Sequence, residues 1–325
     1  MPRIVYSRKY NVGFFGLERT HAFDARKYAR IWRVLRRRFG RGLASLHIRT
    51  DRQVRREELL LVHTEKYLEQ LRDPRYLAAA LEIPGIRNVP YWLIDHVILR
   101  CMRWATRGTM LAFEAALSEG LAFNLGGGFH HAKPDRGEGF SIYADTGIAV
   151  AELRRTGRLA EDARVVYVDT DAHQGNGVCH TFLTDNRVSI FDIFNREIYP
   201  TSDVKARARI DCEVGISNAC TEAEYLAALK QRLPDFLDSV TREPVALGIY
   251  NAGTDVVEDD PLGGLNLSPA AIRERDLFAV GELRRRGIPT VMLPAGGYSQ
   301  ESYRLVAESV IALIETERVR KPLPA

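Results

Sequence analysis

The sequence predicts an α/β fold in which a mostly parallel central sheet is covered by helices on both faces. Two observations carry this prediction. Short apolar runs alternate with segments of helical apolar spacing along the chain. The short runs are almost continuously apolar, as expected of strands that are covered on both faces. No internal repeat or long linker interrupts the pattern, so we expect one domain over residues 1–325.

The expected strands are short runs rich in β-branched and aliphatic residues, the types that favour strands. They cover Ile4–Ser7, Ala122–Leu125, Val165–Asp169, Val188–Phe191, Val245–Tyr250 and Thr290–Leu293. The expected helices cover Ala22–Phe39, Glu57–Leu71, Tyr91–Ser118, Thr146–Thr156, Glu222–Ser239, Pro269–Arg286 and Ser302–Thr316. Thr221 and Ser268 each stand directly before a helix, where a hydroxyl can cap the first turn. Alternation of strands and helices indicates parallel pairing.

Composition and charge describe a globular protein, with 46% apolar and 27% charged residues. The net charge of +4 is weak. The arginine runs at 36–38 and 284–286 lie in helical segments without interleaved aromatics, which favours solvated helix faces over direct nucleic-acid binding. The four cysteines form no CxxC pair, so we expect reduced thiols in a cytoplasmic protein. We expect no membrane span, because no apolar run reaches about 18 residues.

Polar, glycine-rich segments follow four of the expected strands at their carboxyl ends. They are Gly126–His131, Asp169–Gly177, Asn251–Asp255 and Pro294–Tyr298. Ligands of open parallel sheets bind at this edge. The sequence therefore predicts that these four segments meet in one active site.

The segment after the third of the expected strands predicts a metal centre. Residues two apart in an extended chain point the same way, so Asp169, Asp171 and His173 share a face. A cation would relieve the repulsion between the carboxylates. With Asp255 from another strand end, Asp171 and His173 form a set of three ligands, which leaves a catalytic metal one open position. Two oxygens and one nitrogen form a hard site, so Fe(II), Mn(II) or Co(II) could compete with zinc.

Two further segments supply acid–base and hydrogen-bonding groups. The adjacent His130 and His131 follow three glycines and offer proton transfer, although such a pair can also bind a metal or stabilise a core. Tyr298 follows two glycines, and its phenol can donate a hydrogen bond to a developing oxyanion. Taken alone, it would be read as a half-buried tyrosine.

The ordered motifs GGGFHH, DxDAHQGNG, YNAGTD and GGY resemble those of the histone deacetylase family. Other stretches are similar to its class IV branch: Ile4–Ser7, Asn11–Glu18, His21–Lys27, Asp135–Asp145, Ile198–Pro200 and Asp260–Leu265. The resemblance covers nearly the whole chain and implies a three-layer arginase/deacetylase-like fold. It implies a zinc-dependent amidohydrolase that uses metal-activated water. The acyl group, acetyl or long-chain fatty acyl, would be removed from lysine side chains of peptides or proteins or from small amines.

The resemblance also implies roles for individual residues. Asp171, His173 and Asp255 would bind the zinc. His130 and His131 would be the catalytic histidines, one the general base, and the pair would protonate the leaving amine. Tyr298 would donate a hydrogen bond to the substrate carbonyl.

A second group of residues would support the site. Asp169 would orient His130, and a monovalent cation such as K⁺ would be held by the set Asp169, Asp171, His173 and Asp192. The substrate tunnel would be lined by Gly139, Phe140, Tyr199, Gly296 and Gly297. Lys27 falls where many relatives place an arginine beside an internal cavity.

The sequence departs from the family pattern at two places. Asn176 stands where many relatives have an aspartate, although class IV members share the asparagine. The rim aspartate with which relatives grip the substrate backbone has no identifiable equivalent between Glu82 and Pro90. This second departure leaves peptide recognition open, together with the acyl chain length and the oligomeric state.

Two alternatives come from other functional classes. An arginase-like amidinohydrolase would need a second metal ion, but Gly175 and Asn176 follow His173 where that site requires an aspartate. A non-catalytic acyl-lysine binding module would not need the metal ligands, histidines and tyrosine together. Metal stoichiometry separates the first alternative, and turnover of any acyl amide excludes the second.

Substituting Asn176→Asp is expected to change the pH–rate profile of hydrolysis. A neutral amide cannot stabilise an imidazolium at His131 as a carboxylate would. The profile is measured as kcat/KM against pH for both proteins. An unchanged profile would remove Asn176 from the mechanism.

Overall fold

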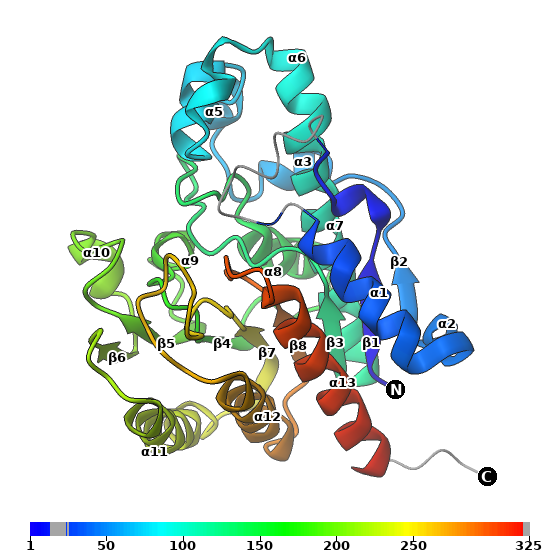
Figure 1. The fold of residues 1–325 in the computed structure, drawn as a ribbon, viewed down its shortest axis with the longest axis vertical. Coiled ribbons are helices and arrows are strands. Elements are labelled where there is room, and N and C mark those ends of the chain that lie inside the picture. The colour runs from blue at the N-terminus through cyan, green and yellow to red at the C-terminus, as the bar shows by residue number, and fades with distance from the viewer. Residues whose placement is uncertain (14–23, 25, 321–325) are drawn as a thin grey trace.

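A parallel sheet of eight strands forms the centre of the computed structural model, which describes residues 1–13, 24 and 26–320 (Figure 1). Its strands are β1 (Arg3–Tyr6), β2 (His47–Arg49), β3 (Leu121–Asn124), β4 (Arg164–Asp169), β5 (Val188–Asn195), β6 (Cys212–Ile216), β7 (Val245–Asn251) and β8 (Thr290–Leu293). Their order across the sheet is β2-β1-β3-β8-β7-β4-β5-β6. Every neighbouring pair is parallel. The predicted α/β class is confirmed.

All six strands expected from the sequence are present, and the two that were missed lie at the edges of the sheet. β2 spans only three residues, none of them buried. Along β6, buried and half-buried residues alternate. Neither strand is covered on both faces, so neither has the continuous apolar run that identified the others.

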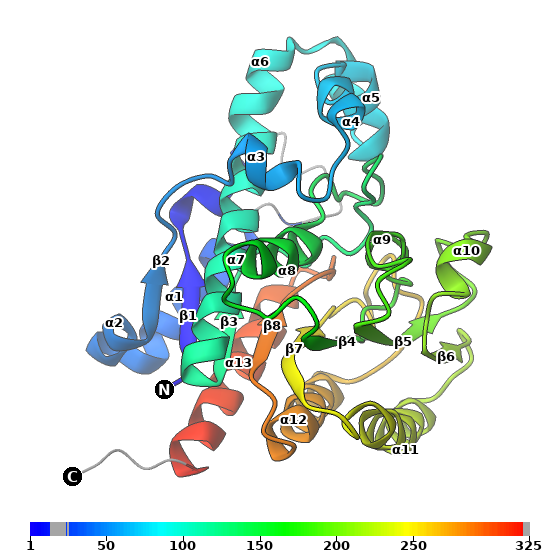
Figure 2. The ribbon, with the colours of Figure 1, turned by 180° about the vertical axis from the view of Figure 1, so that it is seen from behind.

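Helices cover both faces of the sheet, which gives three layers (Figures 1 and 2). One layer holds α1 (Lys27–Phe39), α11 (Glu222–Val240), α12 (Pro269–Arg285) and α13 (Ser302–Arg320). The other holds α7 (Arg100–Glu119), α8 (Asp145–Arg155) and α9 (Asn176–Thr181). The caps expected at two helix starts are confirmed, because the Thr221 hydroxyl accepts from the amide of Glu224 and the Ser268 hydroxyl from that of Ala271.

A lobe of short helices stands beyond the carboxyl edge of the sheet, at the top of Figure 1. It is built from α3 (Arg56–Leu59), α4 (Glu65–Gln70), α5 (Pro74–Ala80), η4 (Pro84–Asn88) and α6 (Tyr91–Ile94). The short helices α2 (Leu43–Leu46) and α10 (Val204–Arg207) lie outside it. The short helices α2, α5, α9 and α10 were not predicted, because four to seven residues are too few to show a helical period.

Three expected helices differ in their extent. The single helix expected over Glu57–Leu71 is wrong, because α3 ends at Leu59 and the Thr64 hydroxyl caps a new helix. The one expected over Tyr91–Ser118 contains a π-helical turn at Asp95–Leu99 between α6 and α7. Of the one expected over Ala22–Phe39, residues 22, 23 and 25 lie outside the described residues, and α1 begins at Lys27.

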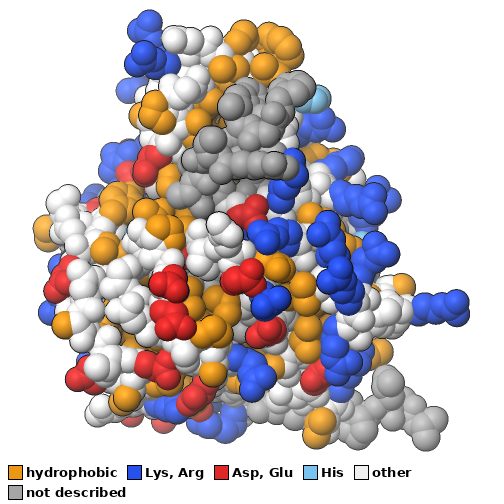
Figure 3. Space-filling view, in the orientation of Figure 1, with side chains coloured by type: hydrophobic (Ala, Val, Ile, Leu, Met, Phe, Trp, Pro, Cys, Tyr) orange, Lys and Arg blue, Asp and Glu red, His pale blue; other side chains and the backbone are white. Residues whose placement is uncertain are grey.

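The arginine run of α1 lies on its solvent side. Arg36, Arg37 and Arg38 are all exposed, and Lys and Arg side chains gather over this helix in Figure 3. Within the described part of the chain, no helix combines the length and apolar character needed to cross a membrane.

A fully buried ion pair on α12 fixes the strand ends that lead into the polar segments. The Arg275 guanidinium donates to the carbonyls of Thr170 (2.9 Å) and Gly253 (2.6 Å). Its Nε donates to Asp276 Oδ1 at 2.9 Å. Arg275 and Asp276 are both 0% exposed. A buried pair costs much to desolvate, so its value depends on every charge keeping a partner.

Removing the anion of this pair is expected to destabilise the protein strongly. Asp276→Ala leaves the Arg275 charge buried without its counterion, which should lower the free energy of unfolding by about 3–5 kcal/mol. Urea titration followed by circular dichroism measures the change. Glu274→Ala, at an exposed position on the same helix, is the control. If the two substitutions lowered the free energy of unfolding equally, the buried pair would not have the predicted role in stability.

Candidate active site

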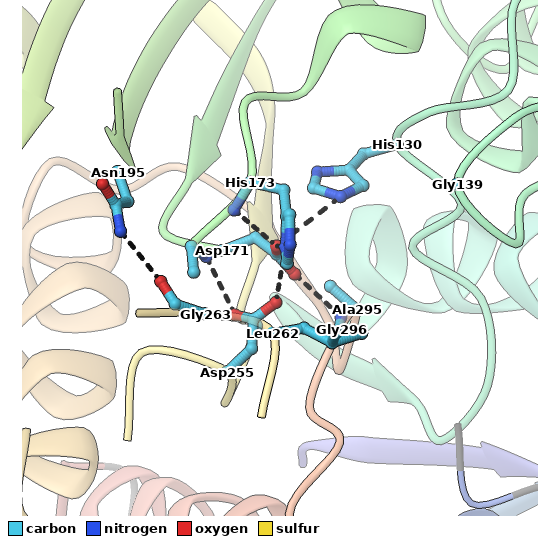
Figure 4. Close-up of polar contacts among 12 residues, drawn as sticks. His130, Gly139, Asp171, His173, Asn195, Asp255, Leu262, Gly263, Ala295 and Gly296 are labelled. Carbon is cyan, nitrogen blue, oxygen red and sulfur yellow. Dashed lines mark hydrogen bonds and ion pairs between the residues drawn. The ribbon is translucent and has the colours of Figure 1, made fainter. Parts of the chain in front are cut away.

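The four polar segments converge because the strands before them are neighbours. β3, β8, β7 and β4 lie side by side in the sheet and run parallel. Their carboxyl ends therefore deliver the segments to one edge, as the sequence predicted. Figure 4 shows His130, His173 and Asp255 pointing toward Asp171 from different segments.

Asp171, His173 and Asp255 form a compact group of possible metal ligands. His173 Nδ1 lies 3.1 Å from Asp171 Oδ1 and 3.0 Å from Asp255 Oδ2. The three side chains are buried, and one donor atom of each lies within 4.8 Å of the others. Bonds of about 2.0–2.2 Å to one zinc ion would place tetrahedral ligands slightly more than 3 Å apart. The donor set and its spacing therefore fit one divalent ion.

Backbone amides hold the two carboxylates in place. The amide of Ala172 donates to Asp255 Oδ1 at 2.8 Å, and that of Gly296 donates to Asp171 Oδ2 at 2.8 Å. A Cβ at Gly296 would lie 2.4 Å from Asp255 Oδ2, closer than two such atoms can approach. Glycine is thus required where this loop passes the ligands.

The electrostatics of the group call for a cation. Burial, together with the neighbouring Asp171, raises the pKa of Asp255 to about 7. Lys27 is buried on the other side of the loop, where its Nζ donates to the carbonyl of Gly296 at 2.8 Å. Burial lowers the pKa of Lys27 to about 8, although Asp255 and Asp171 oppose this effect. An additional positive charge between the carboxylates would remove their repulsion.

The two adjacent histidines have different partners. His130 Nδ1 donates to Asp169 Oδ2 at 2.9 Å, and its Nε2 faces Asp171 Oδ1 at 3.7 Å. Burial alone would lower the pKa of His130, but the carboxylates of Asp171 and Asp169 outweigh it and raise this pKa to about 9. His130 is therefore placed to hold a proton.

His131 faces a neutral amide instead of a carboxylate. Its Nδ1 lies 2.8 Å from Asn176 Oδ1. Burial and the nearby His130 and His173 hold the pKa of His131 well below its usual value. The ring of His131 is therefore neutral, in contrast to that of His130.

Tyr298 completes the polar end of the site. Its ring meets that of His173 edge to face at 6.0 Å. Burial and the carboxylates of Asp171 and Asp255 hold the pKa of the phenol well above 10. The hydroxyl therefore stays protonated and can donate a hydrogen bond.

His130, His131 and Tyr298 line one end of a cavity of about 420 Å³. Of the residues expected in the tunnel, Gly139, Phe140 and Gly296 are in its lining. Tyr199 and Gly297 are not among the described lining residues. Tyr199 is 43% exposed and packs its ring edge to face against His131 at 5.1 Å. Gly297 turns toward Thr254 and Ser302 instead.

Asp192 lies beside Asp169 because the two residues are paired across β5 and β4. Its Oδ2 accepts from the amide of Gly175 at 2.9 Å, whereas its buried Oδ1 has no hydrogen-bond partner among the described residues. Burial and the Asp169 carboxylate hold the pKa of Asp192 well above its usual value. This orphaned oxygen is compatible with the predicted monovalent cation.

Several supporting residues were not identified from the sequence. Asp145 accepts from the amides of Gly128 and Phe129, and thereby fixes the loop before the histidines. Asp260 accepts from the amide of Tyr298 at 2.7 Å. Both aspartates lie in stretches that are similar to class IV members. Their presence in such loops is the feature from which a supporting role could have been predicted. Lys133 lies outside these stretches, and Glu138, although inside Asp135–Asp145, is not part of any catalytic motif.

Comparison with known proteins agrees with this geometry. A family model described as histone deacetylase domain matches residues 21–314. The chain is 38% identical over 308 residues to histone deacetylase 2 of Arabidopsis thaliana, which covers 94% of this chain and 77% of that protein. Among solved structures, the HDA15 HD domain matches with a TM-score of 0.74 at 19% identity, covering 99% of this chain and 90% of that one. An HDAC homolog from Aquifex aeolicus matches with a TM-score of 0.71 at 22% identity, covering 99% and 85%. At such identities the structural matches show the shared fold.

Added Zn²⁺ is expected to stabilise the protein only while the three ligands are intact. An ion that binds only the folded state, present at a concentration of about 100 times its Kd, raises the free energy of unfolding by roughly 2.7 kcal/mol. Thermal unfolding with and without Zn²⁺ should therefore show an upward shift for the wild type and none for Asp171→Asn. Asp162→Asn, at an exposed position, should keep the shift. A full shift in Asp171→Asn would rule out this ligand set.

Proposed function

The chain belongs to the histone deacetylase family, and we propose that it is a metal-dependent hydrolase that removes acyl groups from lysine side chains or related amines. One observation carries the proposal. His130, His131 and Tyr298 line a single cavity, and the group of possible metal ligands lies directly against them. His130 Nε2 is 3.7 Å from Asp171 Oδ1, and the ring of Tyr298 meets that of His173. Amide hydrolysis needs groups of these kinds at one carbonyl.

The residues divide the work of hydrolysis between them. Asp171, His173 and Asp255 would hold the ion, which when bound polarises a carbonyl and makes water more acidic. Tyr298 would donate its hydrogen bond to the carbonyl oxygen, where negative charge develops. His130 and His131 would take a proton from the attacking water and return one to the leaving amine.

Their different partners support different starting states for the two histidines. His131 is neutral and can accept a proton at Nε2, because its Nδ1 proton is directed at Asn176. His130 Nδ1 donates a hydrogen bond to the Asp169 carboxylate. This contact favours the protonated form of His130. The pair thus offers one acceptor and one donor at the same carbonyl, although a bound cation would lower the pKa of His130.

The cavity supports an aliphatic acyl group as the preferred substrate. Beyond the polar end its lining is mostly apolar, with Val12, Ile83, Ile86, Val89, Ile98 and Met102, and Glu82 is the one acidic residue among the described lining residues. Its volume of about 420 Å³ lies in the range of about 300–1,000 Å³ that is common for small-molecule sites. Space of this kind accommodates more than an acetyl group. We therefore extend the proposal to long-chain fatty acyl amides, in keeping with the class IV resemblance and with zinc as the metal.

The decisive measurement is hydrolysis of acyl-lysine peptides from acetyl to myristoyl by the Zn²⁺-loaded protein, with an acetylpolyamine alongside. Turnover should be sensitive to a chelator, and kcat/KM should rise with chain length because longer chains bury more apolar surface in the cavity. A maximum at acetyl would restrict the proposal to deacetylation. No turnover of any substrate, with metal bound, would contradict amide hydrolysis of this class.

Tyr298→Phe serves as the mechanistic variant in the same assay. It removes one hydroxyl and keeps the ring, and loss of such a donor costs roughly 10²–10³ in kcat. Binding of Zn²⁺ should be unchanged, since Tyr298 is not among the ligands. A variant that retains wild-type kcat would exclude the phenol from carbonyl polarisation.

A further inference from the structure

A cluster of charged side chains lies behind His131, on the side away from the ligand group. It consists of Glu138, Asp203, Lys133 and His180, and we refer to it as the carboxylate cluster. Lys133 Nζ lies 2.8 Å from Glu138 Oε1 and 2.7 Å from Asp203 Oδ2. His180 Nε2 lies 3.0 Å from both Asp203 oxygens. Lys133 is only 3% exposed, so its charge depends on these two carboxylates.

Asn176 connects this cluster to His131. Its Nδ2 donates to Glu138 Oε1 at 2.6 Å, and Asp203 Oδ2 is a more distant acceptor at 3.5 Å. Its Oδ1 faces His131 Nδ1 at 2.8 Å. The amide therefore stands between two carboxylates and one imidazole, with the Tyr199 hydroxyl also in contact with Asn176 and Glu138.

The carboxylates determine which way the amide points. If the amide were flipped, its oxygen would face the oxygens of Glu138 and Asp203, which can only accept hydrogen bonds. That orientation would lose the hydrogen bond to Glu138 and add repulsion. Hydrogen-bonding chemistry therefore favours the orientation with Oδ1 toward His131.

The fixed amide in turn determines the tautomer of His131. An amide oxygen accepts only, so Nδ1 of the neutral ring must carry its proton. The lone pair is then left on Nε2, the nitrogen that a proton acceptor needs at the substrate. Without the lock on Asn176, the amide could rotate and accommodate the other tautomer, in which Nε2 carries the proton and cannot accept.

We propose that Glu138 is a positioning residue for catalysis, which acts through Asn176 to hold His131 in the tautomer that accepts a proton at Nε2. The role rests on the proposed function of His131 in hydrolysis. Glu138 supplies from a distance, through a neutral amide, the orienting effect that Asp169 exerts on His130 directly. Lys133 keeps the Glu138 carboxylate in place.

The side chain of Glu138 can be changed without removing the turn in which it stands. Glu138 and Ser141 exchange two backbone hydrogen bonds, from the amide of Glu138 to the carbonyl of Ser141 (3.1 Å) and the reverse (2.9 Å). These bonds do not involve the carboxylate. Glu138→Gln keeps the size of the side chain and removes its charge.

In the wild-type background, Glu138→Gln is expected to lower kcat about tenfold, a minor part of the roughly 10²–10⁴ that positioned proton transfer contributes. KM should stay within about twofold, because the change acts on the chemical step. Asp135→Asn is the matched control, since this exposed carboxylate lies in the same loop and pairs with Arg136 instead of Asn176. An unchanged kcat in Glu138→Gln would overturn the proposal.

The same substitution should have the opposite effect when Asn176 has been replaced by aspartate. The introduced carboxylate would face Glu138 directly and be repelled by it, while a glutamine at position 138 could donate to it. Glu138→Gln should therefore raise kcat of Asn176→Asp. A merely structural role of Glu138 would lower kcat in both backgrounds, and that result would also overturn the proposal.

The tautomer itself can be read by NMR of the Zn²⁺-loaded protein with ¹⁵N-labelled histidine, with His131 assigned by the loss of its signals in His131→Ala. We expect the wild type to show a protonated Nδ1 and an unprotonated Nε2. Glu138→Gln should show a mixture, and Asp135→Asn the wild-type pattern. An identical tautomer in Glu138→Gln would refute the lock. Because this readout needs no substrate, it decides the role of Glu138 even if no acyl amide is turned over.

Discussion

The architecture around the site depends on the burial of two carboxylates with one imidazole between them. Asp171 and Asp255 are both fully buried, and His173 Nδ1 lies within 3.1 Å of an oxygen of each. Such charges are costly inside a protein unless they are paired and hydrogen-bonded. Amide donors from Ala172 and Gly296, and the close approach of a glycine loop, follow from that requirement. A metal ion held by these three side chains would supply the positive charge that the two carboxylates favour.

The central part of the fold could be predicted from the sequence because its strands are covered on both faces. A continuous apolar run such as Val165–Val168 indicates a strand that is covered on both faces. In the edge strand Cys212–Ile216, buried and half-buried residues alternate, and its sequence resembles that of many loops. The same logic applies to the site. Asp169 is the last residue of β4 and is placed by the strand itself, and Asp255 stands four residues after the end of β7.

Supporting residues behave differently, because a contact between distant loops leaves no local pattern. Glu138 and Asp203 meet Asn176 from segments far apart in the chain. Each looks in the sequence like an ordinary surface carboxylate, and only the tertiary structure brings them to one amide. Two histidines that are neighbours in sequence have opposite charge preferences, because the carboxylates of Asp171 and Asp169 outweigh burial and raise the pKa of His130, whereas burial and the nearby rings lower that of His131.

The turn at residues 138–141 limits how the wall of the cavity can be changed. Gly139 and Phe140 have φ values of 52° and 62°, and a Cβ at position 139 would lie 2.5 Å from the ring of His131. Insertions or bulkier residues there would displace the ring of His131 as well as the wall of the cavity. Changes to the shape of this cavity are therefore better made at the Phe140 side chain or at Ile83 and Val89, which are also in its lining. The backbone of this turn cannot be moved without also moving His131.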